Sequence, residues 1–277
     1  MAVTGGGLLA VFVLVALLSA IYTPHDPREV RLDARNRPPE LFSRAEPTSP
    51  GPRYWLGTDA VGRDILSRTM AGARVSLRVG ILVVGSAILV GALLGTLAGY
   101  GGGWIDTLIM RLMDIMLALP GILLAIVIVA VLGPSLRNAM IAVAIVSVPM
   151  YARVMRAEVL RVKEQEFVLA ARALGASDWR IVRKAILPNC LAPLLVQATL
   201  GMGTAILETA GLSYLGLGDD PSTPEWGRMI ADQFRYLRQA PWTVLPPLVA
   251  ISLVVLGFNL LGDGLRDELD PRLKGTR

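Results

Sequence analysis

The sequence contains few charged residues and almost no cysteine or histidine. Charged residues make up 18% of the 277 residues, whereas hydrophobic residues make up 53% and the mean hydropathy is +0.56. Soluble domains typically contain about 25% charged residues. The single cysteine, Cys190, excludes an intrachain disulfide, and the single histidine, His25, leaves no Cys/His metal site. This composition predicts an all-α, polytopic helical bundle in a membrane.

The excess of basic residues indicates contact with a membrane surface. The formal net charge is +5 and the isoelectric point is about 9.7. Nucleic-acid binding would also need positive charge, but here the basic residues lie between apolar runs without interleaved aromatic side chains. We therefore expect membrane lipid, and no nucleic acid, as a partner.

The sequence also lacks the motifs of an energy-converting enzyme. Its three lysines, Lys163, Lys184 and Lys274, do not follow a Gly-x-x-x-x-Gly-Lys-Ser/Thr loop, so we expect no ATP hydrolysis by a P-loop of its own. No cluster of nucleophile, base or metal ligands indicates a catalytic residue or a cofactor in this chain. An ion-coupled secondary transporter, the alternative from another class, would need several carboxylates at membrane depth. Glu208 is the one candidate, and its position near the outer end of a span favours a structural role.

Six apolar segments account for most of the chain, since a transmembrane helix needs about 20 residues. The first, residues 5–22, fits a retained helix better than a signal peptide, because no basic region precedes it and no small-x-small cleavage site ends it. The other predicted spans are residues 79–100, 109–132, 138–152, 191–217 and 242–261.

Two patterns inside these spans predict contacts. Gly91, Gly95 and Gly99 recur every four residues on one face, which permits close approach of another helix. Arg111 and Asp114 are three residues apart near the start of the third span, and we expect them to pair along that helix.

The chain divides into two parts at residue 74. Residues 1–74 comprise the first transmembrane helix, an outer loop with seven prolines between Pro24 and Pro52, and an interfacial segment that begins at Arg68. Residues 75–277 comprise a core of five transmembrane helices and a charged insert at about 153–188.

The positions of the basic residues favour cytoplasmic N- and C-termini. Eight basic residues lie between Arg153 and Lys184 and four in the tail from Arg266 onward, whereas the short outer connections hold four. Nine arginines between Arg28 and Arg74, on the outer side in this arrangement, oppose it. The insert lies inside whether or not the first helix is cleaved.

The insert between the fourth and fifth spans has the pattern of two short helices. Residues 164–174 can form a helix that places apolar residues on one face, namely Phe167, Ala170, Ala171 and Leu174. Gly175 then enters a left-handed turn, a conformation that glycine adopts without strain. We expect Ser177 to cap a second helix, with Trp179, Val182 and Ile186 on one side, and Pro188 to end it.

The insert resembles the cytoplasmic loop of a known family of proteins. Ala170, Ala171, Gly175, Leu187 and Pro188 match the pattern Glu-Ala-Ala, three residues, Gly, nine residues, Ile, one residue, Leu-Pro. This loop is typical of the inner-membrane permease subunits of binding-protein-dependent ABC importers, and the chain is similar to their dipeptide, oligopeptide and nickel permeases.

The resemblance has two departures in the loop and extends well beyond it. Leu169 replaces the glutamate and Ala185 the isoleucine, and Glu166 is the nearest acidic residue that can substitute. Further matches across residues 55–273 are Leu56-Gly-Thr-Asp, Gly62-Arg-Asp, Gly72-Ala-Arg-Val-Ser-Leu, Met110-Arg-Leu-Met-Asp114, Leu212-Ser-Tyr-Leu-Gly-Leu-Gly218 and Asn259-Leu-Leu-Gly-Asp-Gly-Leu-Arg-Asp267.

The resemblance implies a type I ABC importer permease that forms half of a path for short peptides. Expected partners are a second homologous permease, two ATPase subunits that bind ATP and Mg, and an extracytoplasmic solute-binding protein. The coupling loop implied by the resemblance comprises Glu166, Leu169, Ala170, Ala171, Gly175, Ala176, Leu187 and Pro188. Nickel chelates or other small solutes are the alternative substrates.

Overall fold

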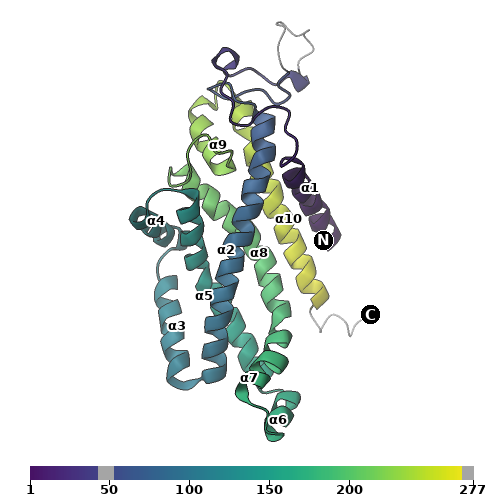
Figure 1. The fold of residues 1–277 in the computed structure, drawn as a ribbon, viewed down its shortest axis with the longest axis vertical. Coiled ribbons are helices and arrows are strands. Elements are labelled where there is room, and N and C mark those ends of the chain that lie inside the picture. The colour runs from purple at the N-terminus through teal and green to yellow at the C-terminus, as the bar shows by residue number, and fades with distance from the viewer. Residues whose placement is uncertain (43–52, 270–277) are drawn as a thin grey trace.

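The computed structural model describes residues 1–42 and 53–269 (Figure 1). These residues form an all-α bundle, as predicted, and their one β-bridge joins Thr58 to Asp64. Part of the proline-rich loop and the basic tail residues Arg272, Lys274 and Arg277 lie outside the described residues.

Five helices form the body of the bundle, and shorter elements connect them. The five are α1 (Ala2–Leu18), α2 (Ile65–Gly101), α5 (Leu136–Lys163), α8 (Leu187–Tyr214) and α10 (Leu245–Leu269). The shorter α-helices are α3 (Gly103–Leu117), α4 (Gly121–Leu132), α6 (Glu166–Ala173), α7 (Asp178–Ile181) and α9 (Trp226–Gln233). The remaining turns are η1 (Leu32–Ala34), η2 (Glu40–Phe42), the π-helical η3 (Val182–Ile186), η4 (Phe234–Tyr236) and η5 (Pro241–Thr243).

Four helical segments of the described chain are long and apolar enough to cross a membrane: Ile65–Gly101, Leu136–Lys163, Asp178–Tyr214 and Leu245–Leu269. The pair α3 and α4 adds at most one more. Helix α1 has 17 residues, and at 1.5 Å per residue it is about 25 Å long.

The third predicted span is not one straight helix. Helix α3 ends at Leu117, α4 begins at Gly121, and the two are bent by 91° at the break. Pro120 explains the break, since it has no N–H to donate and its ring excludes the helical conformation at Leu119. Figure 1 shows α4 turned outward from the bundle beside the upper part of α5.

The fourth predicted span is longer than expected. Helix α5 has 28 residues and continues to Lys163, so Arg153 and Arg156 lie inside it. The helix continues because Val159 and Val162, on its inner side, are fully buried in the core of the bundle. The insert therefore begins at Glu164.

The segment that begins at Arg68 is part of a long helix and not a separate element. It belongs to α2, which is continuous for 37 residues from Ile65, so the predicted boundary at residue 74 falls inside one helix. The Asp64 carboxylate caps this helix by accepting a hydrogen bond from the backbone N–H of Ser67 at 2.9 Å. Arg68 is buried rather than at a lipid surface.

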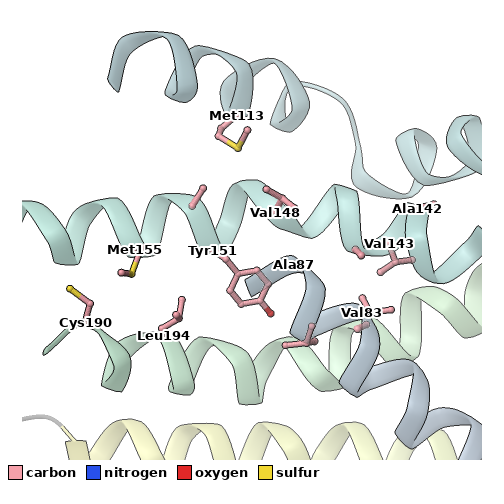
Figure 2. Packing of buried hydrophobic residues seen from close by; sticks show 14 of the residues in the cluster. Val83, Ala87, Met113, Ala142, Val143, Val148, Tyr151, Met155, Cys190 and Leu194 are labelled. Carbon is pink, nitrogen blue, oxygen red and sulfur yellow. The ribbon is translucent and has the colours of Figure 1, made fainter. Parts of the chain in front are cut away.

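The core of the bundle forms where α2, α5 and α8 meet. Figure 2 shows Tyr151 of α5 pointing toward α2 at Ala87, and Met155 of α5 beside Cys190 and Leu194 of α8. Helices α2 and α5 run in the same direction, because Gly91 lies against Tyr151 and Gly99 against Val159.

The glycine stripe on α2 lies at this contact. A Cβ added at Gly95 would lie 2.4 Å from the carbonyl oxygen of Ala152, and one at Gly91 would lie 2.7 Å from Cβ of Tyr151. Such distances leave no space for a side chain, so the two helix backbones approach closely only because these positions are glycine.

The first turn of α1 packs against the last turns of α10. A Cβ at Gly264 would lie 2.4 Å from Cβ of Ala2. The last turns of α10 point toward the end of the molecule that holds α6 and α7, whereas α9 lies at the opposite end (Figure 1).

We expect Gly95→Ala to destabilise the protein by about 1–3 kcal/mol, because the added methyl group overlaps Ala152 and the helices must separate. The matched control is Gly85→Ala in the same helix, where a Cβ meets nothing within 4 Å. The control should be neutral or stabilising, since alanine favours the helix by about 1 kcal/mol. Thermal unfolding of both variants in detergent measures the difference, and equal melting temperatures would contradict the close contact.

Candidate functional site

Residues 164–188, called the knob from here on, form a compact unit on the end of α5. Gly175 joins α6 to α7 with a φ of +78°, which confirms the predicted left-handed turn. Three apolar side chains of the knob, Val168, Ile181 and Ile186, are buried in the same cluster as Val162 of α5. One buried residue from each of α6, α7 and η3 thus holds the knob against the bundle.

The opposite side of the knob exposes large apolar side chains. Leu174 is 88% exposed and Trp179 is 70% exposed, and Phe167 and Leu169 are about half exposed. Trp179 was expected on the same side as Ile186, and this prediction is wrong. The π-helical turn η3 between them has i→i+5 hydrogen bonds, so it changes the rotation per residue and places the two side chains on different sides.

Pro188 does not end a helix, contrary to the sequence prediction. The helical segment continues from Asp178 to Tyr214, and Pro188 lies in the first turn of α8. The π-helical turn directly precedes this proline and accommodates its missing N–H and its ring. The side chain of Asn189 donates a hydrogen bond at 2.7 Å to the carbonyl oxygen of Ala185 in the same turn.

The remaining predicted loop residues differ in exposure. Glu166 lies in the first turn of α6 and is exposed, as are Ala170 and Pro188. Ala171, Ala176 and Leu187 are half-buried. The backbone N–H of Ala176 donates to the carbonyl oxygen of Ala171 at 3.1 Å, which closes the turn around Gly175. Ser177 stands at the N-cap of α7, but its side chain makes no capping hydrogen bond.

Two ion pairs join α3 to α5 near the knob. Arg156 donates two hydrogen bonds to the Asp106 carboxylate, at 2.5 and 2.6 Å, and Arg153 donates to Asp114 at 2.6 Å. The predicted pairing of Arg111 with Asp114 is therefore wrong. Arg153 of α5 reaches Asp114 across the contact between the two helices. Arg153 and Asp114 are 39 residues apart in the sequence, and Arg156 and Asp106 are 50 apart, so a rule based on spacing within one helix does not predict these pairs.

Helix α2 makes two further polar contacts at this end. The Tyr100 hydroxyl donates to the carboxylate of Asp178, the first residue of α7. The Lys163 ammonium, at the end of α5, donates to the carbonyl oxygen of Gly99 at 3.0 Å. Lys163 precedes α6 in the sequence and Asp178 follows it, and no short sequence motif indicated either contact.

The opposite end of the bundle contains a buried polar layer that the sequence analysis did not anticipate. Arg63 donates to the Asp59 carboxylate and to the carbonyl oxygen of Pro221, both at 2.6 Å. Arg68 donates to the carbonyl oxygens of Pro27 and Pro221 at 2.9 and 3.1 Å. The two arginines thus link the connection before α2 to the connection before α9, which contains Pro221.

The start of α9 completes this layer. The Glu225 carboxylate accepts hydrogen bonds from the backbone N–H groups of Gly227 and Arg228, at 2.9 and 2.8 Å. Burial raises the pKa of Glu225, because the charged form loses its hydration, while these backbone hydrogen bonds act in the opposite direction. Trp226 is buried and donates through its indole N–H to the carbonyl oxygen of Thr69 in α2 at 2.9 Å.

Glu208 is half-buried in the part of α8 nearest α9. Neighbouring Ile206 packs with Gly80 and Ala73 of α2, so Glu208 lies at the height of the exposed Arg74 and Arg78 rather than at the middle of the bundle. Within the described ranges, no three His, Cys, Asp or Glu side chains are placed to hold a metal ion.

A bundle of membrane-length helices with a packed knob between two of them is the architecture of a membrane permease. Residues 91–275 match the family described as the binding-protein-dependent transport system inner membrane component. The chain belongs to this family.

Its curated relatives are of similar length and are named for peptide transport. The chain is 50% identical to the dipeptide transport system permease protein DppC of Alkalihalophilus pseudofirmus, over 99% of this chain and 86% of that protein. It is 49% identical to the di/tripeptide transport system permease protein DppC of Pseudomonas aeruginosa, over 98% and 88%. It is 44% identical to the glutathione transport system permease protein GsiD of Shigella dysenteriae, over 99% and 88%.

Solved structures share the fold. An inward-facing structure of the MetNI methionine ABC transporter matches with a TM-score of 0.62 and 21% identity, over 73% of this chain and 96% of that chain. The type I importer permease fold expected from the sequence is therefore confirmed.

We expect Asp59→Ala to destabilise the protein by about 3–5 kcal/mol, because it leaves the Arg63 charge buried without its partner. The matched control is Glu29→Ala, which removes the partner of Arg31. The side chains of Asp59 and Arg63 are 2% and 8% exposed, whereas those of Glu29 and Arg31 are 43% and 35% exposed. The control should cost less than about 1 kcal/mol. Denaturant unfolding in detergent gives both values, and a small effect of Asp59→Ala would show that the pair is not essential to this layer.

Proposed function

We propose that this chain is the permease subunit of an ATP-driven importer of short peptides in the cytoplasmic membrane of a bacterium or archaeon. In this proposal the chain forms half of the path and carries no ATPase site. A solute-binding protein delivers the peptide outside, and a second homologous permease forms the other half of the path. Two ATPase subunits, which bind ATP and Mg, supply the energy.

The apolar face of the knob is the observation that carries this proposal. Leu174 and Trp179 are exposed on a charged segment that in this proposal lies in the cytoplasm, where lipid would not cover them. Exposed apolar groups of this size are typical of protein interfaces, and tryptophan is enriched among the residues that contribute most to binding. We infer that this face docks in a groove of one ATPase subunit.

The packing of the knob against the bundle supports a mechanical role. Its buried side chains, Val168, Ile181 and Ile186, allow the knob little independent motion relative to α5. Closure of the two ATPase subunits on ATP would displace both knobs, and each would carry its helices as a rigid body between inward-open and outward-open states.

The same arrangement supports cytoplasmic termini. The packed ends of α1 and α10 point toward the knob end of the bundle, so an ATPase docked on the knob favours both on the inner side. The polar layer around Asp59 and Arg68 then faces the outside, where the solute-binding protein delivers the peptide.

The peptide assignment comes from the relatives. The names of those reported above state dipeptides, di- and tripeptides, and glutathione, which are all small peptides. They span nearly all of this chain, and nothing in the described residues favours nickel.

A capture experiment tests docking. The ATPase subunits of the same transporter are co-expressed with the chain, and the affinity of the complex is measured in detergent. We expect Trp179→Ala and Leu174→Ala each to weaken binding by about 2 kcal/mol, or roughly 30-fold, if both are central contacts. Ile21→Ala is the control, because Ile21 is 89% exposed and follows the end of α1 rather than belonging to the knob.

Two results would argue against the proposal. The first is unchanged capture of the ATPase by the Trp179→Ala and Leu174→Ala variants. The second is ATP hydrolysis by the purified chain without partners. Mass spectrometry of complexes from native membranes identifies both the partner proteins and the bound small molecule.

A second substitution tests the turn. Gly175→Val should reduce peptide-stimulated ATPase activity about tenfold or more, because a β-branched residue at a φ of +78° is strained and shifts α6 relative to α7. Gly175→Asn is the control, since asparagine tolerates the left-handed conformation. No atom lies within 4 Å of an added Cβ, so the bundle itself should stay folded. Normal stimulation in Gly175→Val would show that the turn is not needed for coupling.

A further inference from the structure

Helix α2 has no covalent link to the knob, yet it touches both ends of the bundle. With 37 residues it is about 55 Å long. At its first turn, Arg68 holds the polar layer through the carbonyl oxygens of Pro27 and Pro221. At its last turn, Tyr100 bonds to Asp178 in the knob.

The covalent connection of the knob to α8 passes through an irregular helix. The π-helical turn η3 and Pro188 interrupt the regular hydrogen-bond ladder between Asp178 and α8, and Pro193 follows one turn later. Such irregularities are where helices bend. Motion of α7 is therefore transmitted less directly to α8 than a regular helix would transmit it.

The contact with α2 offers a direct route from the same residue. Asp178 is the first residue of α7, and its carboxylate accepts a charge-assisted hydrogen bond from the Tyr100 hydroxyl. Trp179, the next residue, is on the exposed apolar face. The single turn α7 thus connects the exposed apolar face of the knob, through Trp179, to α2, through Asp178.

A second contact holds α2 to the end of α5, directly before the knob. Lys163 precedes the knob and donates to the carbonyl oxygen of Gly99, one residue before Tyr100. Gly99 belongs to the glycine stripe that packs against α5. Displacement of the knob relative to α2 would therefore break the Tyr100–Asp178 hydrogen bond, whereas the Lys163 contact holds the end of α5 to α2.

We propose that Tyr100 and Asp178 are positioning residues that make α2 move with the knob, so that ATPase motion reaches the polar layer at the far end of α2. This inference rests on the proposed docking of an ATPase at the knob. It assigns a role to Tyr100, which lies outside the coupling loop, and to Asp178, whose position the loop pattern leaves unspecified.

The test uses the complete transporter in proteoliposomes, with its partner subunits and binding protein. Uptake of a radiolabelled dipeptide and ATP hydrolysis are measured together. We expect Tyr100→Phe, which removes only the hydroxyl, to lower the peptide taken up per ATP about tenfold. Asp178→Asn keeps an acceptor without the charge and should cost less, about threefold. Tyr22→Phe is the matched control, because Tyr22 is exposed beyond the end of α1.

A double-mutant cycle separates coupling from folding. If the two residues act through one bond, the Tyr100→Phe/Asp178→Asn variant should transport as Tyr100→Phe alone does. ATPase capture by Tyr100→Phe and its melting temperature should be unchanged.

Three outcomes would overturn this inference. These are normal uptake per ATP in Tyr100→Phe, a double-variant loss equal to the product of the single losses, and a loss proportional only to the amount of assembled complex. Each leaves the docking proposal intact, whereas failure of the unaltered chain to capture an ATPase would refute docking itself.

Discussion

The close contact between α2 and α5 is the constraint on which the rest of the structure depends. Gly91, Gly95 and Gly99 bring the two backbones so near that neither helix can slide without a clash. In a membrane, where lipid is as apolar as a leucine side chain, such packing is what holds helices together. Because α5 continues into the knob and α2 continues to the polar layer, this contact joins the two ends of the molecule.

Charged residues serve this framework at both ends. Asp106 and Asp114 on α3 pair with arginines of α5 near the knob, and Arg63 and Arg68 bind carbonyl oxygens at the far end. Arg63 and Arg68 are buried, and buried charges are costly unless they are paired, so their contacts fix the outer connections that supply the partners. The pairs of α3 with α5 are more exposed and join these two helices at the surface.

Local patterns predicted the local features of this chain well. The helical class, the close-packing glycines and the left-handed turn at Gly175 each depend on nearby residues or on composition. One error is local, since Pro188 is tolerated because the π-helical turn directly precedes it. The other errors arose where distant residues decide. Arg68 lies buried in α2 because carbonyl groups from two distant loops bind it. Asp114 pairs with Arg153 rather than Arg111 because a neighbouring helix brings that arginine closer.

The sequence by itself determined that the chain is a bundle of apolar helices, with an amphipathic insert between two of them whose spacing matches one permease family. Periodicity and composition are sufficient for this, because the membrane forces apolar segments into helices. Only the tertiary structure decided which face of the insert is buried, that Asp114 pairs with Arg153, and that Tyr100 meets Asp178. Those features depend on side chains that are far apart in the chain and become neighbours only when the helices pack.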